Sequence, residues 1–137
     1  MWWIYALLSA FFAALTAIFA KIGIKNVDTD LATAIRTVVI LILAWSIAFF
    51  RGGTNTIGSL TKHNLIFLVL SGFATGLSWI FYFKALQMGK VSQVAPIDKL
   101  SVALAIVFSI IFLGETLTLK TGIGAACIIA GTLIIIL

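Results

Sequence analysis

The chain has 137 residues, of which 63% are hydrophobic and 9% charged, and its formal net charge is +5. Because a soluble domain carries about 25% charged residues, this composition excludes a soluble globular protein and indicates one embedded in a bilayer. The positive charge does not indicate a nucleic-acid partner, since the bases are scattered over short connecting segments and form no stripe interleaved with aromatic residues. In a membrane protein such bases reflect orientation and contact with membrane lipids.

Five apolar segments are long enough to cross a bilayer, which takes roughly 20 residues of helix. The sequence predicts these helices at residues 2–20, 31–50, 65–84, 92–113 and 118–137. Continuous apolar runs exclude the alternating polarity of a β-barrel, so the predicted fold class is an all-α membrane protein. The connections are too short for a separate soluble core, and residues 1–137 are predicted to form one domain. The first run lacks a positively charged start and further apolar runs follow it, so a retained helix is expected rather than a signal peptide.

The sequence offers no constellation typical of an enzyme. It has no nucleophile–base pair, no phosphate-binding loop and no cluster of metal ligands, so neither catalysis nor a cofactor or metal is expected. The single cysteine, Cys127, excludes an internal disulfide and is expected to be a small packing residue.

Charged residues inside two of the predicted spans are candidate functional residues, because an ionisable group is costly in a bilayer. Arg36 lies about five residues into the second helix and Asp98 about six residues into the fourth, which places both about 8–9 Å deep from the same side. We therefore predict that they pair. Proton coupling through Asp98 is the alternative, but neighbouring positive charges favour the ionised carboxylate. Lys99 either joins this charged group or extends toward the interface, and both readings stay open.

Pro96 stands in the stretch VAPIDKLS, at the predicted start of the fourth helix. The preferred reading is that it begins the helix, where its missing N–H costs nothing. The alternative is a local break that exposes backbone polar groups to a water-filled cavity.

Aromatic and small residues supply the remaining candidates. Trp79 and Tyr82, near the end of the third helix, line a solute chamber or belong to an interfacial aromatic belt. Gly72 and Gly76 have the G-x-x-x-G spacing that brings helices close, and packing within one protomer is the expected use. On the last helix small residues recur every four positions and form a candidate dimer interface; they are Gly122, Ala126 and Ala130.

The stretch 81–116 resembles the C-terminal half of an EamA domain of the drug/metabolite transporter superfamily. The resemblance rests on YFKALQMG at 82–89, VAP at 94–96 and LGE at 113–115, and the five-helix count agrees. It implies half of a ten-helix inverted-repeat transporter. Alternating access needs two facing halves, so the resemblance implies that a second chain, most simply an antiparallel copy, completes the transporter.

Loop charges give a partial test of dual topology. The side of the N-terminus holds three bases, Arg51, Lys62 and Lys120, and the opposite side holds four, Lys21, Lys25, Lys84 and Lys90. Three against four is almost no positive-inside bias and favours insertion in both orientations. Adding Arg36 and Lys99 to the second side gives three against six, which favours one fixed orientation.

The expected function is transport of a small-molecule solute across the cell inner (plasma) membrane by an antiparallel homodimer. Small multidrug exporters of the same superfamily use a glutamate in the first helix, and this chain has no acid between Trp2 and Ala20. Arg36, Lys99 and Asp98 sum to one positive charge, so a neutral, zwitterionic or anionic solute is expected. The alternatives are a dual-topology ion channel and a non-transporting subunit of a heteromeric membrane complex.

Overall fold

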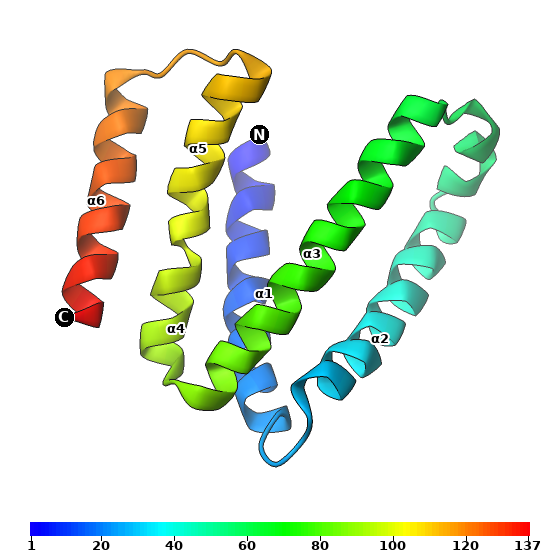
Figure 1. Cartoon of the computed structure of the whole chain (residues 1–137). Coiled ribbons are helices and arrows are strands. Elements are labelled where there is room, and N and C mark those ends of the chain that lie inside the picture. The colour runs from blue at the N-terminus through cyan, green and yellow to red at the C-terminus, as the bar shows by residue number, and fades with distance from the viewer. The chain divides into compact units, whose positions relative to one another are not determined.

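A computed structural model describes all residues 1–137, and all of its regular elements are helices (Figure 1). In chain order they are α1 (Trp2–Gly23), α2 (Thr29–Phe50), the 3₁₀-helix η1 (Gly53–Ser59), α3 (Lys62–Met88), α4 (Val91–Asp98), α5 (Leu100–Leu113) and α6 (Leu119–Ile136). Five stretches are long and apolar enough to cross a membrane, with α4 and α5 together forming the fourth, Val91–Leu113. The predicted all-α fold class with five spans is confirmed.

Helices α2 and α3 begin earlier than predicted, because polar capping turns precede their apolar runs. The Asp28 carboxylate accepts hydrogen bonds of 3.0 Å from the backbone N–H groups of Asp30 and Leu31, so α2 starts at Thr29. The Thr61 hydroxyl accepts a 3.2 Å bond from the N–H of Asn64 at the start of α3. A count of apolar residues misses such turns, although they belong to the helix.

Two glycines in the left-handed region end helices at sharp turns. Gly52 (φ 73°) follows the end of α2, and Gly114 (φ 67°) follows α5. A side chain at such a φ is strained, which explains glycine at both points. The segment after Gly52, predicted as a loop, forms η1, where the hydroxyls of Thr56 and Ser59 donate 2.7 Å bonds to carbonyls three residues back.

The fourth span is interrupted, whereas the sequence predicted one continuous helix at 92–113. Pro96 lies well inside α4, so the prediction that it begins the helix is wrong. Because proline has no N–H, the Ser92 carbonyl loses its usual donor four residues on, and α4 ends at Asp98. The N–H of Lys99 then contacts the carbonyls of Ala95 (3.3 Å) and Pro96 (3.1 Å) before α5 begins.

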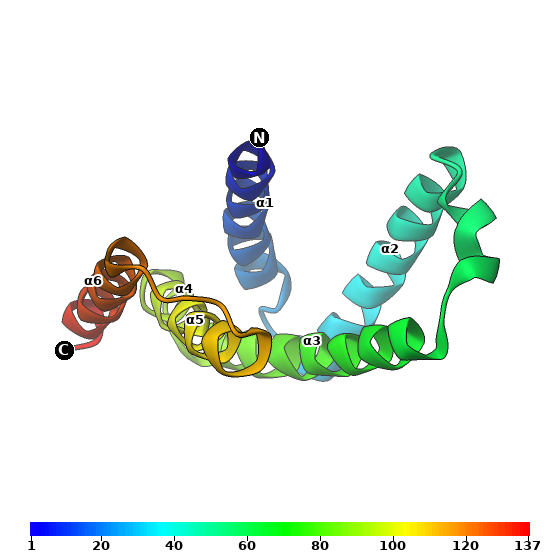
Figure 2. The same cartoon turned by 90° about the horizontal axis from the view of Figure 1, so that it is seen from above.

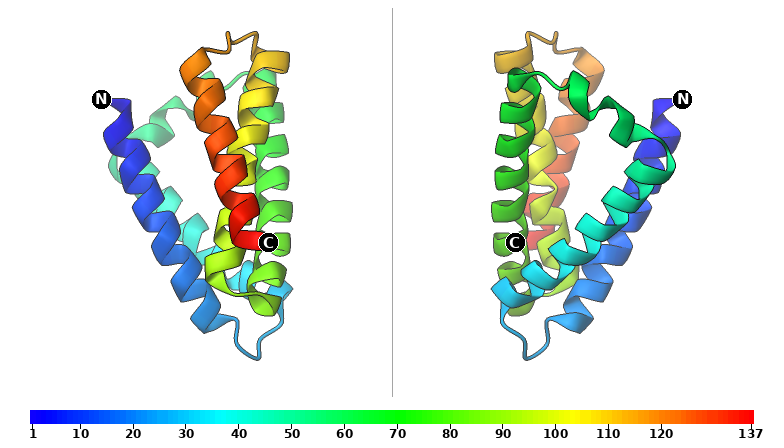
Figure 3. Two further views of the ribbon diagram at one scale, coloured as in Figure 1. Left: turned by 90° about the vertical axis from the view of Figure 1, so that its left-hand side faces the viewer. Right: turned by 90° about the vertical axis from the view of Figure 1, so that its right-hand side faces the viewer.

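The chain forms two compact units, one of residues 1–18 and 88–137 and the other of residues 19–87. In the first unit α5 and α6 run antiparallel and side by side, and α6 also contacts α4 (Figure 3). The Thr132 hydroxyl of α6 lies 3.3 Å from the carbonyl oxygen of Pro96 and 2.8 Å from that of Ile128. A side chain of α6 thus reaches the backbone beside the helix break.

In the second unit α2 and α3 are antiparallel. They lie closest where the start of α2 meets the end of α3 and move apart toward η1 (Figure 2). Near the close end, on α3, lie Phe83 and Leu86, the two large side chains that are fully buried. Large apolar side chains are exposed on every span, as suits a surface that faces lipid or other helices.

Candidate functional site

The cation of Arg36 on α2 lies against two aromatic rings of α3. Its guanidinium carbon is 4.9 Å from the centroid of the Trp79 ring and 4.5 Å from that of Phe83. Both distances fall within the range of about 6 Å in which a cation is attracted to a ring face. We call these three residues the arginine–aromatic cluster.

The spacing of residues on both helices explains why this cluster forms. Trp79 and Phe83 are four residues apart and therefore lie on one face of α3. On α2, Arg36 shares a face with Thr29 and Thr33, which are buried. The Thr33 hydroxyl donates a 2.8 Å bond to the Thr29 carbonyl, so its burial leaves no unpaired polar atom.

The guanidinium nitrogens of Arg36 take part in no hydrogen bond or ion pair. The side chain is half-buried, and no buried side-chain nitrogen or oxygen lacks a partner anywhere in the chain. The unpaired nitrogens of Arg36 are therefore accessible. Arginine is planar and presents five donors along its edge, so the cluster combines a held cation with free donors.

Hydrogen bonds connect the end of α3 to the end of α1 and to the α1–α2 turn. The Gln87 amide donates hydrogen bonds to the carbonyls of Val27 (2.8 Å) and Ile24 (3.3 Å), and Lys21 donates one to the carbonyl of Leu86. The bond from Lys21 satisfies one of the carbonyls that a helix end leaves unpaired. These bonds stabilise the α1–α2 turn against α3.

Tyr82, another predicted site residue, lies between Trp79 and Phe83 in the sequence, and its side chain is half-buried. Its ring lies 6.1 Å from that of Phe83, and Tyr82 lies close to the guanidinium of Arg36. The structure thus brings Arg36, Trp79 and Tyr82 together, as candidates that the sequence had proposed separately. Phe83 was not among those candidates, although its four-residue spacing from Trp79 was the signal for it.

Asp98 and Lys99 lie at the junction of α4 and α5, next to the break that follows Pro96. Their side chains are 3.4 Å apart and 34% and 56% exposed, respectively. An ion pair with this much exposure is weak, so both charges can change partners. The pairing of Arg36 with Asp98 would join the two units and stays a prediction.

The predicted dimer face on α6 has exposed alanines. At 100° per residue, Ala126 and Ala130 project about 120° and 160° away from Thr132, the residue that reaches α4. Both are exposed, and Gly122 is half-buried beside Leu117.

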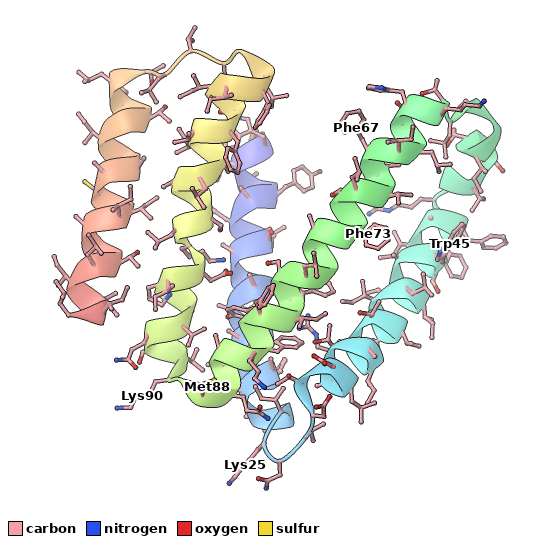
Figure 4. The ribbon with its side chains drawn as sticks, viewed as in Figure 1. Lys25, Trp45, Phe67, Phe73, Met88 and Lys90 are labelled. Atoms are coloured by element: carbon pink, nitrogen blue, oxygen red, sulfur yellow. The ribbon has the colours of Figure 1, made fainter.

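The glycines of α3 lie in a groove of their own helix. The groove has a volume of about 410 Å³ and is lined by α3 residues only, among them Gly72, Phe73 and Gly76; Figure 4 labels Phe73 beside this stretch of α3. Apart from chain neighbours and the nearby backbone of α3 itself, no heavy atom lies within 4 Å of the place that a Cβ would occupy at either glycine. The close packing that the G-x-x-x-G spacing predicted is therefore not formed in this unit.

Comparison with known proteins gives the family. The model of the EamA-like transporter family matches residues 1–137. The chain belongs to this family. A Sinorhizobium protein named as an uncharacterized transporter is 47% identical over 134 residues, which cover 98% of this chain and 95% of the relative. An uncharacterized protein of Methanocaldococcus jannaschii is 34% identical over 71 residues, 52% of each chain. No solved structure matches.

The family and the five spans together make the chain a multi-pass membrane transporter. The EamA resemblance, whose motifs lie in 81–116, is confirmed, and the family match covers the whole chain. The family and its transporter-named relative point to transport rather than enzymatic chemistry.

Proposed function

We propose that the protein moves a small metabolite across the inner membrane by alternating access, as an antiparallel homodimer. The observation that carries the proposal is the interrupted span Val91–Leu113, with Pro96 inside its first helix and Asp98 and Lys99 at the junction. Transporters bind solutes and coupling ions at discontinuous helices, where freed backbone groups face a cavity. Ionisable groups within a span are costly in lipid, so an acid and a base beside the break support a functional role.

The homodimer follows from the number of spans. A chain with five spans has its two ends on opposite sides of the membrane, so an antiparallel copy supplies the inverted half that alternating access needs. The connecting segments carry three basic residues on one side of the membrane and four on the other, and these nearly equal numbers support insertion in both orientations. The exposed Ala126 and Ala130 on α6 give the copy a surface of small side chains to pack against.

Topology is the first test, with single cysteines in a Cys127→Ala background. Gly58 in η1 suits one end of α3, because a Cβ there meets no atom within 4 Å. Met88 suits the other end, since it is 81% exposed and lies at the α3–α4 turn (Figure 4). We expect a membrane-impermeant thiol reagent on whole cells to label each site in about half of the molecules. Labelling of one site alone would contradict the antiparallel homodimer and favour a heteromeric complex.

Flux measurements test the mechanism. In vesicles that contain the purified protein, alternating access predicts solute uptake that saturates with concentration and is accelerated by solute on the opposite side. Uptake that rises linearly and carries current in proportion to voltage would contradict alternating access and identify a channel.

A further inference from the structure

The geometry points to the arginine–aromatic cluster as a binding site for a monovalent oxyanion, such as the carboxylate of a small organic acid. This inference rests on the proposed transport function, because it assigns the chemical class of the solute. It concerns Arg36, Trp79 and Phe83, which all lie in the second unit.

Arg36 has no counter-ion in its own unit. Between Leu31 and Gln87 the chain contains no acidic residue, so neither α2 beyond its first turn nor α3 can neutralise the guanidinium. Of the two acids at the start of α2, Asp28 caps the helix, and Asp30 lies six residues before Arg36, about 9 Å along the helix axis and about 120° around it. An arginine in a membrane span normally pairs with another group or marks a solute pathway. The second unit therefore leaves the Arg36 charge without a negative partner, and a solute anion and the predicted partner Asp98 are alternatives for it.

The aromatic rings fix how that partner approaches. Trp79 and Phe83 lie against the guanidinium at 4.9 and 4.5 Å and restrain it, while neither ring carries an acceptor oxygen or nitrogen that would engage the guanidinium N–H groups. The N–H groups along the edge of a guanidinium form two parallel bonds to a carboxylate or a phosphate. An anion that meets this edge gains both hydrogen bonds and charge neutralisation.

The single positive charge of the cluster determines which charge state of an anion it binds best. Lys84, the base next to Phe83 on α3, is exposed, and Lys21 of α1 already donates to the Leu86 carbonyl, so Arg36 supplies the one positive charge within the cluster. A monovalent anion is neutralised by it, whereas a dianion would leave one charge uncompensated in a region of low dielectric. Carboxylates and phosphodiesters meet this condition, and the second group includes the head groups of anionic lipids.

Fluorescence of Trp79 gives the test. The full-length protein with Trp2, Trp3 and Trp45 changed to Phe retains Trp79 alone, and it is reconstituted into phosphatidylcholine vesicles. We expect propionate to change the emission in a saturable way. Propionamide, which has the same shape and no charge, is expected to bind at least tenfold more weakly. Equal responses to propionate and propionamide would overturn the inference, and this comparison needs no variant of the cluster.

Variants then assign the response to Arg36. Arg36→Gln is expected to abolish the propionate response, and Arg36→Lys to weaken it several-fold because the paired donors are lost. Arg51→Gln removes a base at the end of the same helix and is expected to change nothing. A full response in Arg36→Gln would overturn the inference. Phosphatidylglycerol in the vesicles identifies the source: a soluble acid is the ligand if propionate still acts, and a lipid head group if the lipid alone produces the Arg36-dependent change.

Flux in the same vesicles separates this inference from the proposed function. Binding of propionate without uptake of any solute supports the oxyanion site and contradicts transport. Saturable uptake of a neutral solute that Arg36→Gln leaves unchanged supports transport and overturns the oxyanion site.

Discussion

The guanidinium carbon of Arg36 lies 4.5 Å from the centre of the Phe83 ring, and that ring is completely buried. A long arginine side chain on α2 is thus held by a side chain of α3 that cannot itself move into lipid. The position of the charge therefore depends on how α2 and α3 meet. Substitutions in this contact test both the packing of the second unit and the site.

Phe83→Leu is expected to lower the melting temperature of the purified protein. The change removes a ring–cation contact of about 0.5–2 kcal/mol together with part of a fully buried side chain. Phe81→Leu is the matched control, because Phe81 is two residues away and 70% exposed. Equal shifts in the two variants, measured by thermal unfolding in detergent, would show that the contact with Arg36 contributes nothing.

Trp79 is expected to act through its ring face rather than through its indole N–H. Trp79→Phe retains a face for Arg36 and should leave solute KM within about threefold, since an exposed cation–ring contact is worth about 0.5–1 kcal/mol. Trp79→Leu removes the face and should raise KM several-fold further. Initial rates of uptake into vesicles measure both. A larger loss in Trp79→Phe than in Trp79→Leu would contradict this role.

Much of the fold was predictable because membrane spans are set by length and hydrophobicity. The interruption near Lys99 was not, since a proline close to the start of an apolar run is compatible with a helix start as well as with a break, and the sequence favoured the helix start. In the structure Lys90 is the N-cap residue of α4, so the helix begins at Val91 and Pro96 lies in its interior. The contact of Arg36 with Phe83 could not be predicted from the sequence, for a related reason. Periodicity shows which residues share a face of a helix, but not which faces meet.

Pro96→Ala is expected to favour a continuous fourth span. Alanine restores an N–H that can bond to the Ser92 carbonyl, and it removes the ring that opposes helix at that point, an effect of about 3 kcal/mol in a helix interior. We expect an unchanged or higher melting temperature and at least a tenfold lower rate of uptake. Loss of stability together with rate would indicate that the proline is needed for folding, and an unchanged rate would show that the break has no part in transport.

Gln87 is expected to stabilise the α1–α2 turn through its side-chain amide. Gln87→Leu removes the hydrogen bonds to the Val27 and Ile24 carbonyls, each worth about 0.5–1.5 kcal/mol, and should lower the melting temperature. Gln93→Leu is the control, because Gln93 is an exposed glutamine whose side chain makes no such bond. Similar melting temperatures for the two variants would assign the stability of the turn to other contacts.

Self-association through α6 is expected to depend on which face carries a large side chain. Ala126→Leu places a bulky group on the proposed dimer face, where small residues allow helices to approach closely, and should lower the dimer fraction in detergent. Gly124→Leu is the matched control: it adds a larger side chain, meets no atom within 4 Å, and projects about 200° around the helix from Ala126. Light scattering and cross-linking measure the dimer fraction. If Gly124→Leu disrupts the dimer and Ala126→Leu does not, the copies meet through the opposite face of α6, and the contact predicted at Gly122, Ala126 and Ala130 is wrong.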